Sequence, residues 1–393
     1  MSESQPKGAS VVVVGAGVTG LSAAWWLARS GVDVLVLDKG IVGWEASGRS
    51  GGGCTHHQSP LFAEEQRLWP QMDALLGYPT EFQPRRLRIA LTEKQLEAMT
   101  VGVENTRRQG FPVEWVDAAQ ARALAPLLGD RAVGGALFGC GGHANPQRTV
   151  QAYAWALRDL GGAIWQHAAV TGFTTSGGRV TAVRTTAGDF ACDSVVLAAG
   201  PQTGALSAML DAEVPVAPAR AEMIVTEPLP PMPLGGTDGN GLYGRQTLRG
   251  NLAYGGGPHE WLTASESDSD ALKPSSPLAR NVAKRLAELF PRAAHARVIR
   301  TWAGIIENTP DGRPVIDRLP TFGNATVATM SSVGFGLSPA SGRAIAEIVT
   351  EGQCSFADLS TFRLSRFGNL SPDWRERRGW IPPAGSAGRD EAA

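Results

Sequence analysis

The apolar positions of the chain change their period from segment to segment, and each period predicts an element. Residues 11–14 form an unbroken run of valines, which is typical of a parallel strand buried on both faces. The stretch 21–29 is rich in alanine, leucine and tryptophan and predicts a helix that ends before Gly31. Residues 32–37 then predict a second buried strand, so the order is that of a βαβ unit.

The same two periods recur along the rest of the chain. Apolar residues that alternate or run together between turn residues predict further strands at 86–91, 219–226, 241–246, 251–255 and 325–330. Helical periodicity predicts helices at 59–76, 146–160, 276–289 and 339–349. Strands and helices mixed in this way predict an α/β protein.

Composition narrows the classes of partner. The 393 residues are 43% hydrophobic and 19% charged, so the chain can bury a large core. Its 36 basic and 37 acidic residues give a net charge of -1, which attracts no polyanion, and we expect no nucleic acid as a partner. The start is polar and no run of about eighteen apolar residues occurs, so we expect no membrane insertion and a cytoplasmic location.

The cysteines predict neither a metal site nor a disulfide framework. They are scattered, and none belongs to a CxxC pair or to a metal-ligand spacing. We therefore expect reduced thiols at Cys54, Cys140, Cys192 and Cys354.

A glycine turn joins the first predicted strand to the first helix. Its pattern GxGxxG places Gly15, Gly17 and Gly20 where a tight turn, a close approach to a pyrophosphate and helix packing are needed. Asp38 follows about twenty residues later at the end of the second strand, where a carboxylate accepts the hydroxyls of a ribose. The predicted contacts with a dinucleotide are Gly15, Gly17, Val18, Thr19, Gly20, Asp38 and Lys39.

A second glycine-rich segment, residues 43–53, has too many glycines for a core element. It indicates backbone that passes close to a large planar ligand such as a flavin, although a flexible surface loop is the alternative. The predicted contacts are Ser47, Gly48, Arg49, Ser50, Gly51 and Gly52, of which the two serines and the arginine can donate to phosphates.

With three further blocks the sequence resembles the D-amino acid oxidase-like family of FAD-dependent oxidoreductases, in particular its glycine oxidase and sarcosine oxidase β-subunit branch. The blocks are GDFACDSVVLAAGP at 188–201, TWAG at 301–304 continuing to TPDGRP at 309–314, and VGFGLSPASG at 333–342. They follow one another in family order over nearly the whole chain.

The resemblance implies a Rossmann-like FAD-binding domain and a discontinuous substrate domain on a mixed sheet, as in glycine oxidase. The expected FAD-binding segments are 1–80, 145–205 and 300–368, the expected substrate-binding segments are 81–144 and 206–299, and 369–393 is expected to be a C-terminal tail.

The resemblance also implies FAD as the cofactor. Cysteine is absent from the family's covalent flavin position near Gly304, so non-covalent FAD is implied. Amides at the start of the last helix would stabilise the anionic reduced ring, because a helix N-terminus carries positive charge. The further cofactor contacts implied are Val170, Ala199, Gly200, Gly334, Phe335, Gly336 and Leu337.

The residues that would hold the substrate depart from the family. Its two carboxylate-binding arginines would fall at Ile306 and near Ser332 in this chain. Since an arginine fork binds a carboxylate through two parallel hydrogen bonds, we expect Arg245 to replace them, the alternative being a solvated arginine at a strand end. His56 and His57 follow the glycine loop and are candidates to bind the substrate or accept a proton.

Two further side chains are candidates for the reaction. Tyr243 would wall the pocket and Glu307 would meet a cationic amine, unless each is structural. The lysine that the sarcosine oxidase type is thought to use to activate dioxygen would fall near Ala253, which leaves dioxygen or another electron acceptor open.

The resemblance and these candidates predict an FAD-dependent amine oxidoreductase. It would oxidise the C–N bond of a glycine-like or N-substituted (N-carboxymethyl or N-alkyl) amino acid to an imine that hydrolyses, with glyoxylate or an aldehyde and hydrogen peroxide as products. The alternatives are a D-amino acid or cyclic imino acid dehydrogenase that passes electrons to a partner, and a flavoprotein without enzymatic activity. A homo-oligomer is compatible with the sequence.

Overall fold

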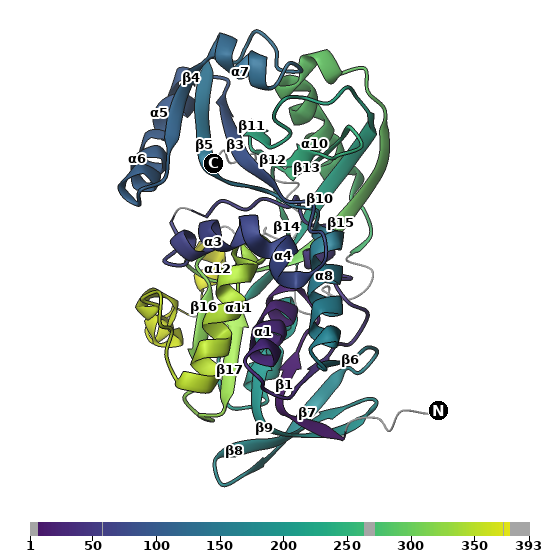
Figure 1. The fold of residues 1–393 in the computed structure, drawn as a ribbon, viewed down its shortest axis with the longest axis vertical. Coiled ribbons are helices and arrows are strands. Elements are labelled where there is room, and N and C mark those ends of the chain that lie inside the picture. The colour runs from purple at the N-terminus through teal and green to yellow at the C-terminus, as the bar shows by residue number, and fades with distance from the viewer. Residues whose placement is uncertain (1–6, 57, 263–271, 372, 378–393) are drawn as a thin grey trace.

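The computed structural model is built on two β-sheets that lie one above the other along the long axis of the molecule (Figure 1). It describes residues 7–56, 58–262, 272–371 and 373–377. The chain crosses between the sheets several times, so each sheet is assembled from distant segments. This arrangement confirms the predicted α/β class.

The first sheet has eight strands and a parallel centre. The βαβ unit forms as predicted, since β1 pairs in parallel with β2 on one side and with β9 on the other. β17 and β6 extend the parallel part beyond β9 and β2. The strands are β1 (Gly8–Val14), β2 (Val34–Leu37), β6 (Ala163–Trp165), β7 (Val170–Ser176), β8 (Arg179–Thr185), β9 (Gly188–Leu197), β16 (Val315–Arg318) and β17 (Ala325–Thr329).

Three helices cover one face of this sheet: α1 (Val18–Arg29), α8 (Pro146–Asp159) and α11 (Gly334–Glu351). α1 and α11 pack closely, because Gly342 has no side chain to collide with Ser22. The Ser22 hydroxyl donates to the carbonyl of Ser338 at 2.7 Å, and the indole of Trp26 donates to that of Pro339 at 3.0 Å. Buried apolar side chains of the three helices form one core with the sheet.

The second sheet has nine strands and is mixed, since β11 pairs in parallel with β3 and its other neighbours are antiparallel. Its strands are β3 (Gln83–Ala90), β4 (Val113–Asp117), β5 (Gly134–His143), β10 (Ala217–Pro228), β11 (Thr237–Gly239), β12 (Leu242–Gln246), β13 (Asn251–Gly256), β14 (Glu260–Trp261) and β15 (Val298–Asn308). The long strand β15 pairs with β10 in this sheet although the sequence assigns most of it to the FAD-binding segments. The domain bounds themselves stay a prediction.

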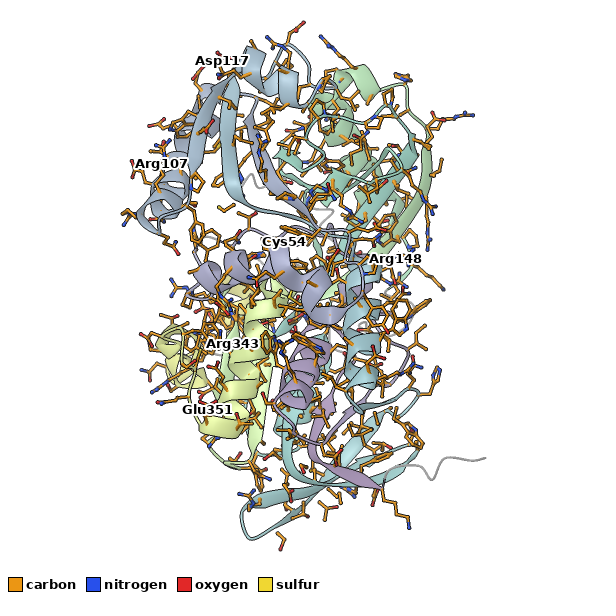
Figure 2. All side chains as sticks on the ribbon, viewed as in Figure 1. Cys54, Arg107, Asp117, Arg148, Arg343 and Glu351 are labelled. Carbon is orange, nitrogen blue, oxygen red and sulfur yellow. The ribbon has the colours of Figure 1, made fainter. Side chains whose placement is uncertain are left out.

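The outer part of the second sheet carries short helices that periodicity did not predict. They are α5 (Glu93–Ala98), α6 (Thr100–Arg108) and α7 (Ala118–Leu124). α7 begins at a capping box in which Asp117 and Gln120 satisfy each other's backbone amides. Arg107 and Asp117 lie here, at the end of the molecule remote from the first sheet (Figure 2). α10 (Ser276–Leu289), predicted with the same bounds, covers the inner strands with Val282, Leu286 and Leu289.

Two predicted helices differ from those observed. The stretch 59–76 is divided into α3 (Phe62–Leu68), the 3-10 helix η1 (Trp69–Gln71) and α4 (Met72–Leu76), because Pro70 cannot donate a backbone hydrogen bond. The last helix begins at Gly334 rather than at Pro339, which lies inside it. None of the helices in these described segments is long and apolar enough to cross a membrane.

Candidate functional site

A cavity of about 590 Å³ lies where the parallel strands of the first sheet end and β15 of the second sheet passes. The carboxyl ends of parallel strands are the usual place for a ligand in such a sheet. The predicted cofactor contacts that line it are Gly15, Gly17, Val18, Thr19, Asp38, Lys39, Ser47, Ser50, Val170, Ala199, Gly200, Gly334 and Phe335. The others, Gly20, Gly48, Arg49, Gly51, Gly52, Gly336 and Leu337, are outside this lining.

The glycine turn at one end of the cavity allows no side chains at two positions. A Cβ at Gly15, where φ is +111°, would overlap the carbonyl of Ala198, and a Cβ at Gly20 would overlap the carbonyl of Gly15. The turn therefore packs directly on β9 and leaves its amides at the cavity wall.

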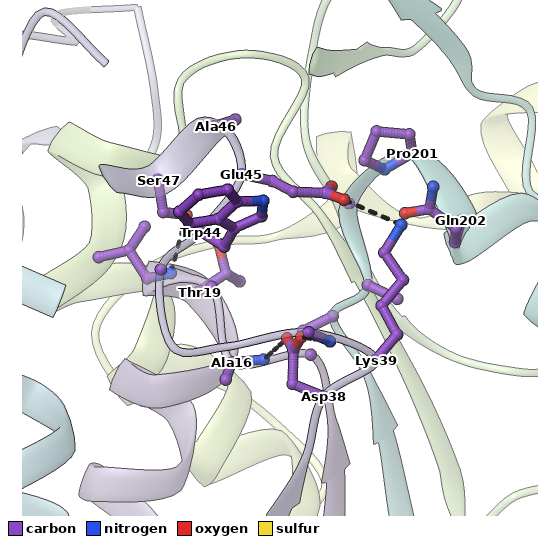
Figure 3. Close-up of a pocket in the computed structure, with 18 of the residues that line it drawn as sticks. Ala16, Thr19, Asp38, Lys39, Trp44, Glu45, Ala46, Ser47, Pro201 and Gln202 are labelled. Carbon is purple, nitrogen blue, oxygen red and sulfur yellow. Dashed lines mark hydrogen bonds and ion pairs between the residues drawn. The ribbon is translucent and has the colours of Figure 1, made fainter. Parts of the chain in front are cut away.

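Asp38 is fixed at the end of β2 beside this turn (Figure 3). Its Oδ2 accepts the amide of Ala16 at 2.6 Å, and its Oδ1 accepts the amide of Gly40 at 2.7 Å. Each carboxylate oxygen can accept one further hydrogen bond, and Asp38 lines the cavity. Asp38 can therefore accept hydroxyls of a ribose, as predicted, while it also stabilises the turn.

The loop 40–50 supplies further polar groups that suit a phosphate-bearing ligand. Lys39 and Glu45 form an ion pair of 2.9 Å at the cavity wall, and Ser47 accepts the amide of Val18 at 2.9 Å (Figure 3). The Ser50 hydroxyl is buried and has no partner among the described residues. This orphaned hydroxyl, the exposed amides of the turn and Asp38 together fit FAD.

Arg49 does not face the cavity. Its guanidinium donates to the carbonyls of Trp44 at 2.6 Å and Ala303 at 3.0 Å, and it stacks over the Trp44 ring at 4.7 Å. The indole of Trp302 donates to the Arg49 carbonyl at 2.9 Å, so this pair ties the loop to β15. Burial, together with the nearby charge of Arg300, lowers the pKa of Arg49. Arg49 could make the predicted phosphate contact only after breaking its hydrogen bonds to the carbonyls of Trp44 and Ala303.

The other end of the cavity is closed by the first turn of α11. Ser331 and Ser332 take left-handed conformations, with φ of 47° and 71°, and turn the chain from β17 into the helix. The amides of Gly334, Phe335 and Gly336 have no intrahelical acceptor, and the first two residues line the cavity. The Leu337 amide instead donates to the Val333 carbonyl at 3.2 Å. Of the four predicted contacts in this turn, Leu337 is therefore the one whose amide already has an acceptor within the helix.

His56 lies against this same helical turn. A Cβ at Gly336 would collide with the His56 ring and with the Gly53 carbonyl, so the glycine permits both contacts. The Nδ1 atom of His56 is 2.9 Å from Oε1 of Glu65, which is fully buried in α3. Nothing in the sequence singles out Glu65, because it lies within an ordinary amphipathic helix. His57 lies outside the described residues.

Tyr243 and Arg245 project from β12 onto the glycine loop. A Cβ at Gly51 would stand 2.8 Å from the Tyr243 ring, and Arg245 donates to the Gly51 carbonyl at 2.8 Å. Burial raises the pKa of Tyr243 to about 12 and lowers that of Arg245 to about 10. Among the described residues no carboxylate lies within ion-pair distance of Arg245, and the charge of the more distant Glu81 offsets the cost of burial only in part.

A second buried arginine, which sequence reasoning missed, lies beside it. Arg86 donates from Nε and Nη2 to the two oxygens of Asp238, both at 2.5 Å, and from Nη1 to the Gly142 carbonyl at 3.0 Å. This bidentate pair joins neighbouring strands β3 and β11. Arg86 is committed to Asp238, whereas Arg245 has no such partner.

Glu307 lines the cavity from β15, next to Ile306. It thus lies with the cofactor contacts and not with Tyr243 and Arg245, which are outside the lining. Within the described ranges, no group of three or more histidine, cysteine or acidic side chains is placed to hold a metal ion.

Comparison with known proteins gives a consistent result. A family model described as FAD dependent oxidoreductase matches residues 10–348. The chain is 28% identical over 375 residues to sarcosine oxidase subunit beta of Rhodobacter capsulatus, covering 91% of this chain and 88% of the relative. It is 31% identical over 364 residues to glycine oxidase of Pseudomonas aeruginosa, covering 86% and 94%. The structure of L-proline dehydrogenase from P. horikoshii shares the fold, with a TM-score of 0.84, 23% identity and coverage of 95% and 99%.

Proposed function

Because this chain belongs to the family of FAD-dependent oxidoreductases, we propose that it oxidises the C–N bond of an amino acid whose nitrogen carries a substituent. The product is an imine, which water hydrolyses. Bound FAD supplies the chemistry by accepting a hydride, so the protein has mainly to bind and orient the substrate. We infer non-covalent FAD, because none of the four cysteines lines the cavity.

The buried guanidinium of Arg245, which has no carboxylate within ion-pair distance among the described residues, is the observation that carries this proposal. A buried cation without a counter-ion is costly, and a substrate carboxylate would remove that cost. Arg86 at the neighbouring position already has Asp238 as its counter-ion. Arg245 is therefore the residue proposed to bind the carboxylate.

The face of the second sheet around Arg245 is lined mostly by uncharged residues. The strand registers place Tyr243, Gly255, Met223 and Trp302 in one row across β12, β13, β10 and β15. The next positions along β10 and β15 are uncharged, with Ala221 opposite Gly304 and Ala219 opposite Ile306. Ile306, where the resemblance implies an arginine, presents an apolar surface to the cavity. These residues favour a substrate with an apolar substituent on nitrogen.

We therefore propose that free glycine is a poor substrate and that a long-chain N-carboxymethyl amino acid is a better one. Glyoxylate is released when the carboxymethyl carbon is oxidised, and hydrogen peroxide forms when dioxygen is the acceptor. The test is anaerobic bleaching of the flavin, with glyoxylate assayed, for glycine, sarcosine and a long-chain N-carboxymethyl amino acid. A higher specificity constant for glycine than for the long-chain compound contradicts this choice, and no bleaching by any amino acid contradicts the oxidoreductase reading of the site.

A second candidate function is that of a dehydrogenase, which passes electrons to a partner instead of dioxygen. Ala253 lies directly opposite Arg245 on β13, at the place where the resemblance expects a dioxygen-activating lysine. Reduced flavin that reoxidises slowly in air but rapidly with a quinone or dye would support a dehydrogenase of N-substituted or cyclic imino acids.

A further inference from the structure

Glu307 is an acidic side chain inside the cavity that the family implies is filled by an anionic cofactor. Its Oε1 accepts the amide of Met330 at 2.9 Å and the hydroxyl of Thr329 at 3.2 Å. These bonds come from the end of β17 and hold the carboxyl group in one position. The other oxygen, Oε2, borders the cavity at Gly200, 4.0 Å from the point where a Cβ on that glycine would stand.

Among the described residues, no cationic side chain forms an ion pair with this carboxyl group. β10 places Pro218 opposite Glu307, the 3-10 helix η2 (Gly200–Gln202) presents uncharged residues, and the turn after β17 presents Ser331 and Ser332. The charged side chains in the cavity lining are Asp38, Lys39 and Glu45. Lys39 is paired with Glu45 and Asp38 holds backbone amides, so none of them neutralises Glu307.

These surroundings favour the neutral acid. Burial raises the pKa of Glu307, and this effect outweighs the opposing hydrogen bonds from the amides of Met330 and Ser331 and the hydroxyl of Thr329. FAD brings further negative charge in its pyrophosphate, which disfavours a carboxylate in the same cavity. A neutral carboxyl group, in contrast, has one hydroxyl to donate.

We propose that Glu307 binds FAD as a carboxylic acid whose Oε2 hydroxyl donates a hydrogen bond to the cofactor. Glu307 is then a cofactor-binding residue and not the partner of the substrate amine that the sequence suggested. The proposal rests on the FAD dependence of the family and is independent of the substrate proposed above.

The consequence is a defined dependence of FAD affinity on pH. Since the pKa of Glu307 would be higher with FAD bound than without it, affinity is greatest below the pKa of the FAD-free protein. It falls as pH rises to the pKa of the FAD complex and is constant above that value. Loss of a hydrogen bond and gain of a repelled charge predict about a tenfold to hundredfold faster release of FAD across this range.

The experiment measures FAD release from the holoprotein without substrate, by the fluorescence of free flavin after dilution, from about pH 6 to pH 9. Glu307→Gln keeps an oxygen acceptor for Met330 and a donor toward the cavity, but it cannot ionise. The expected result is faster release at high pH for the parent and the same slow release at all pH values for Glu307→Gln.

Glu222→Gln is the matched control. Glu222 is also a buried carboxyl group with a pKa raised mainly by burial, and it lies on β10, the strand that pairs with β15, outside the cavity lining. This variant should keep the parental dependence on pH, whereas a flat profile in it would show that the effect is general and overturn the proposal.

Two other results overturn it: a parental release rate that does not change with pH, or a Glu307→Gln variant that keeps the parental pH dependence. If Glu307→Gln does not fold, infrared difference spectra of the parent replace it, with loss of a protonated carboxyl band on release at high pH expected. Absence of that band contradicts the proposal. Failure of the amino acids to bleach the flavin would affect only the proposed substrate.

Discussion

The two ends of the site are built in different ways. The glycine-turn end uses backbone amides and one carboxylate from residues 15–40, all within one βαβ unit. The opposite end joins the first turn of α11, the loop 50–53 and strand β12, which are up to about 280 residues apart in the chain. Local geometry therefore builds the groups proposed to hold the nucleotide part of FAD, whereas long-range packing places those proposed to bind the substrate. Cys54 marks this junction between the two sheets (Figure 2).

The largest effect is expected from the buried Arg86–Asp238 ion pair, which lies beside Arg245 at the second end, and it should appear in the free energy of unfolding. Asp238→Ala leaves Arg86 buried without its counter-ion and should lower the free energy of unfolding by about 3 to 5 kcal/mol. Urea denaturation measures this loss. The double variant Asp238→Leu with Arg86→Leu should recover most of it, since neither member of this pair is then left as a buried charge without its partner. A single variant as stable as the parent would show that the pair has no structural role.

At the glycine-turn end, a substitution should change the affinity for FAD more than the stability of the fold. Asp38→Ala removes the acceptor for the ribose and for the Ala16 and Gly40 amides, so FAD affinity should fall by about 1.5 to 3 kcal/mol. Titration of FAD-free protein with FAD measures the change. Asp38→Asn keeps one neutral oxygen as an acceptor, so its FAD affinity should lie between those of the parent and Asp38→Ala. Unchanged affinity in Asp38→Ala would exclude the ribose contact.

The smallest effect is expected from Arg245, the buried arginine proposed to bind the substrate carboxylate. Arg245→Lys keeps the charge but loses the fork, so flavin reduction at low substrate should slow by about tenfold to hundredfold, equivalent to about 1.4 to 2.7 kcal/mol. Stopped-flow absorbance measures it, and an amine without a carboxylate is the control that should not respond. Parental reduction rates in this variant would direct the search to His56.

The sequence was most informative where the structure is local. The valine run of β1, the glycine turn and Asp38 are neighbours in the chain, and their predicted βαβ unit forms. The family resemblance, FAD and the oxidoreductase class are confirmed by the match over residues 10–348. Helix bounds failed where a proline is accommodated inside, as at Pro339, because the Ser22 and Trp26 side chains bond the carbonyls beside it.

Long-range partners could not be predicted. Arg86 and Asp238 are 152 residues apart, and nothing in either segment indicates the other. Arg49 lies in a glycine loop typical of phosphate contacts, yet the distant carbonyl of Ala303 binds it. The structure shows where Arg245, His56 and Tyr243 lie, and their roles in the reaction stay predictions.

The strand order of the first sheet also has a consequence for the synthesis of the protein. β1 needs β9 beside it, and α1 needs α11, whose first residue is Gly334. A nascent chain therefore exposes the apolar face of α1 on the ribosome until α11 has been translated. With FAD held by both the first glycine turn and the last helix, as the resemblance implies, the cofactor would bind only after that point. Cofactor loading and the packing of α11 on α1 would then be one step in the maturation of this enzyme.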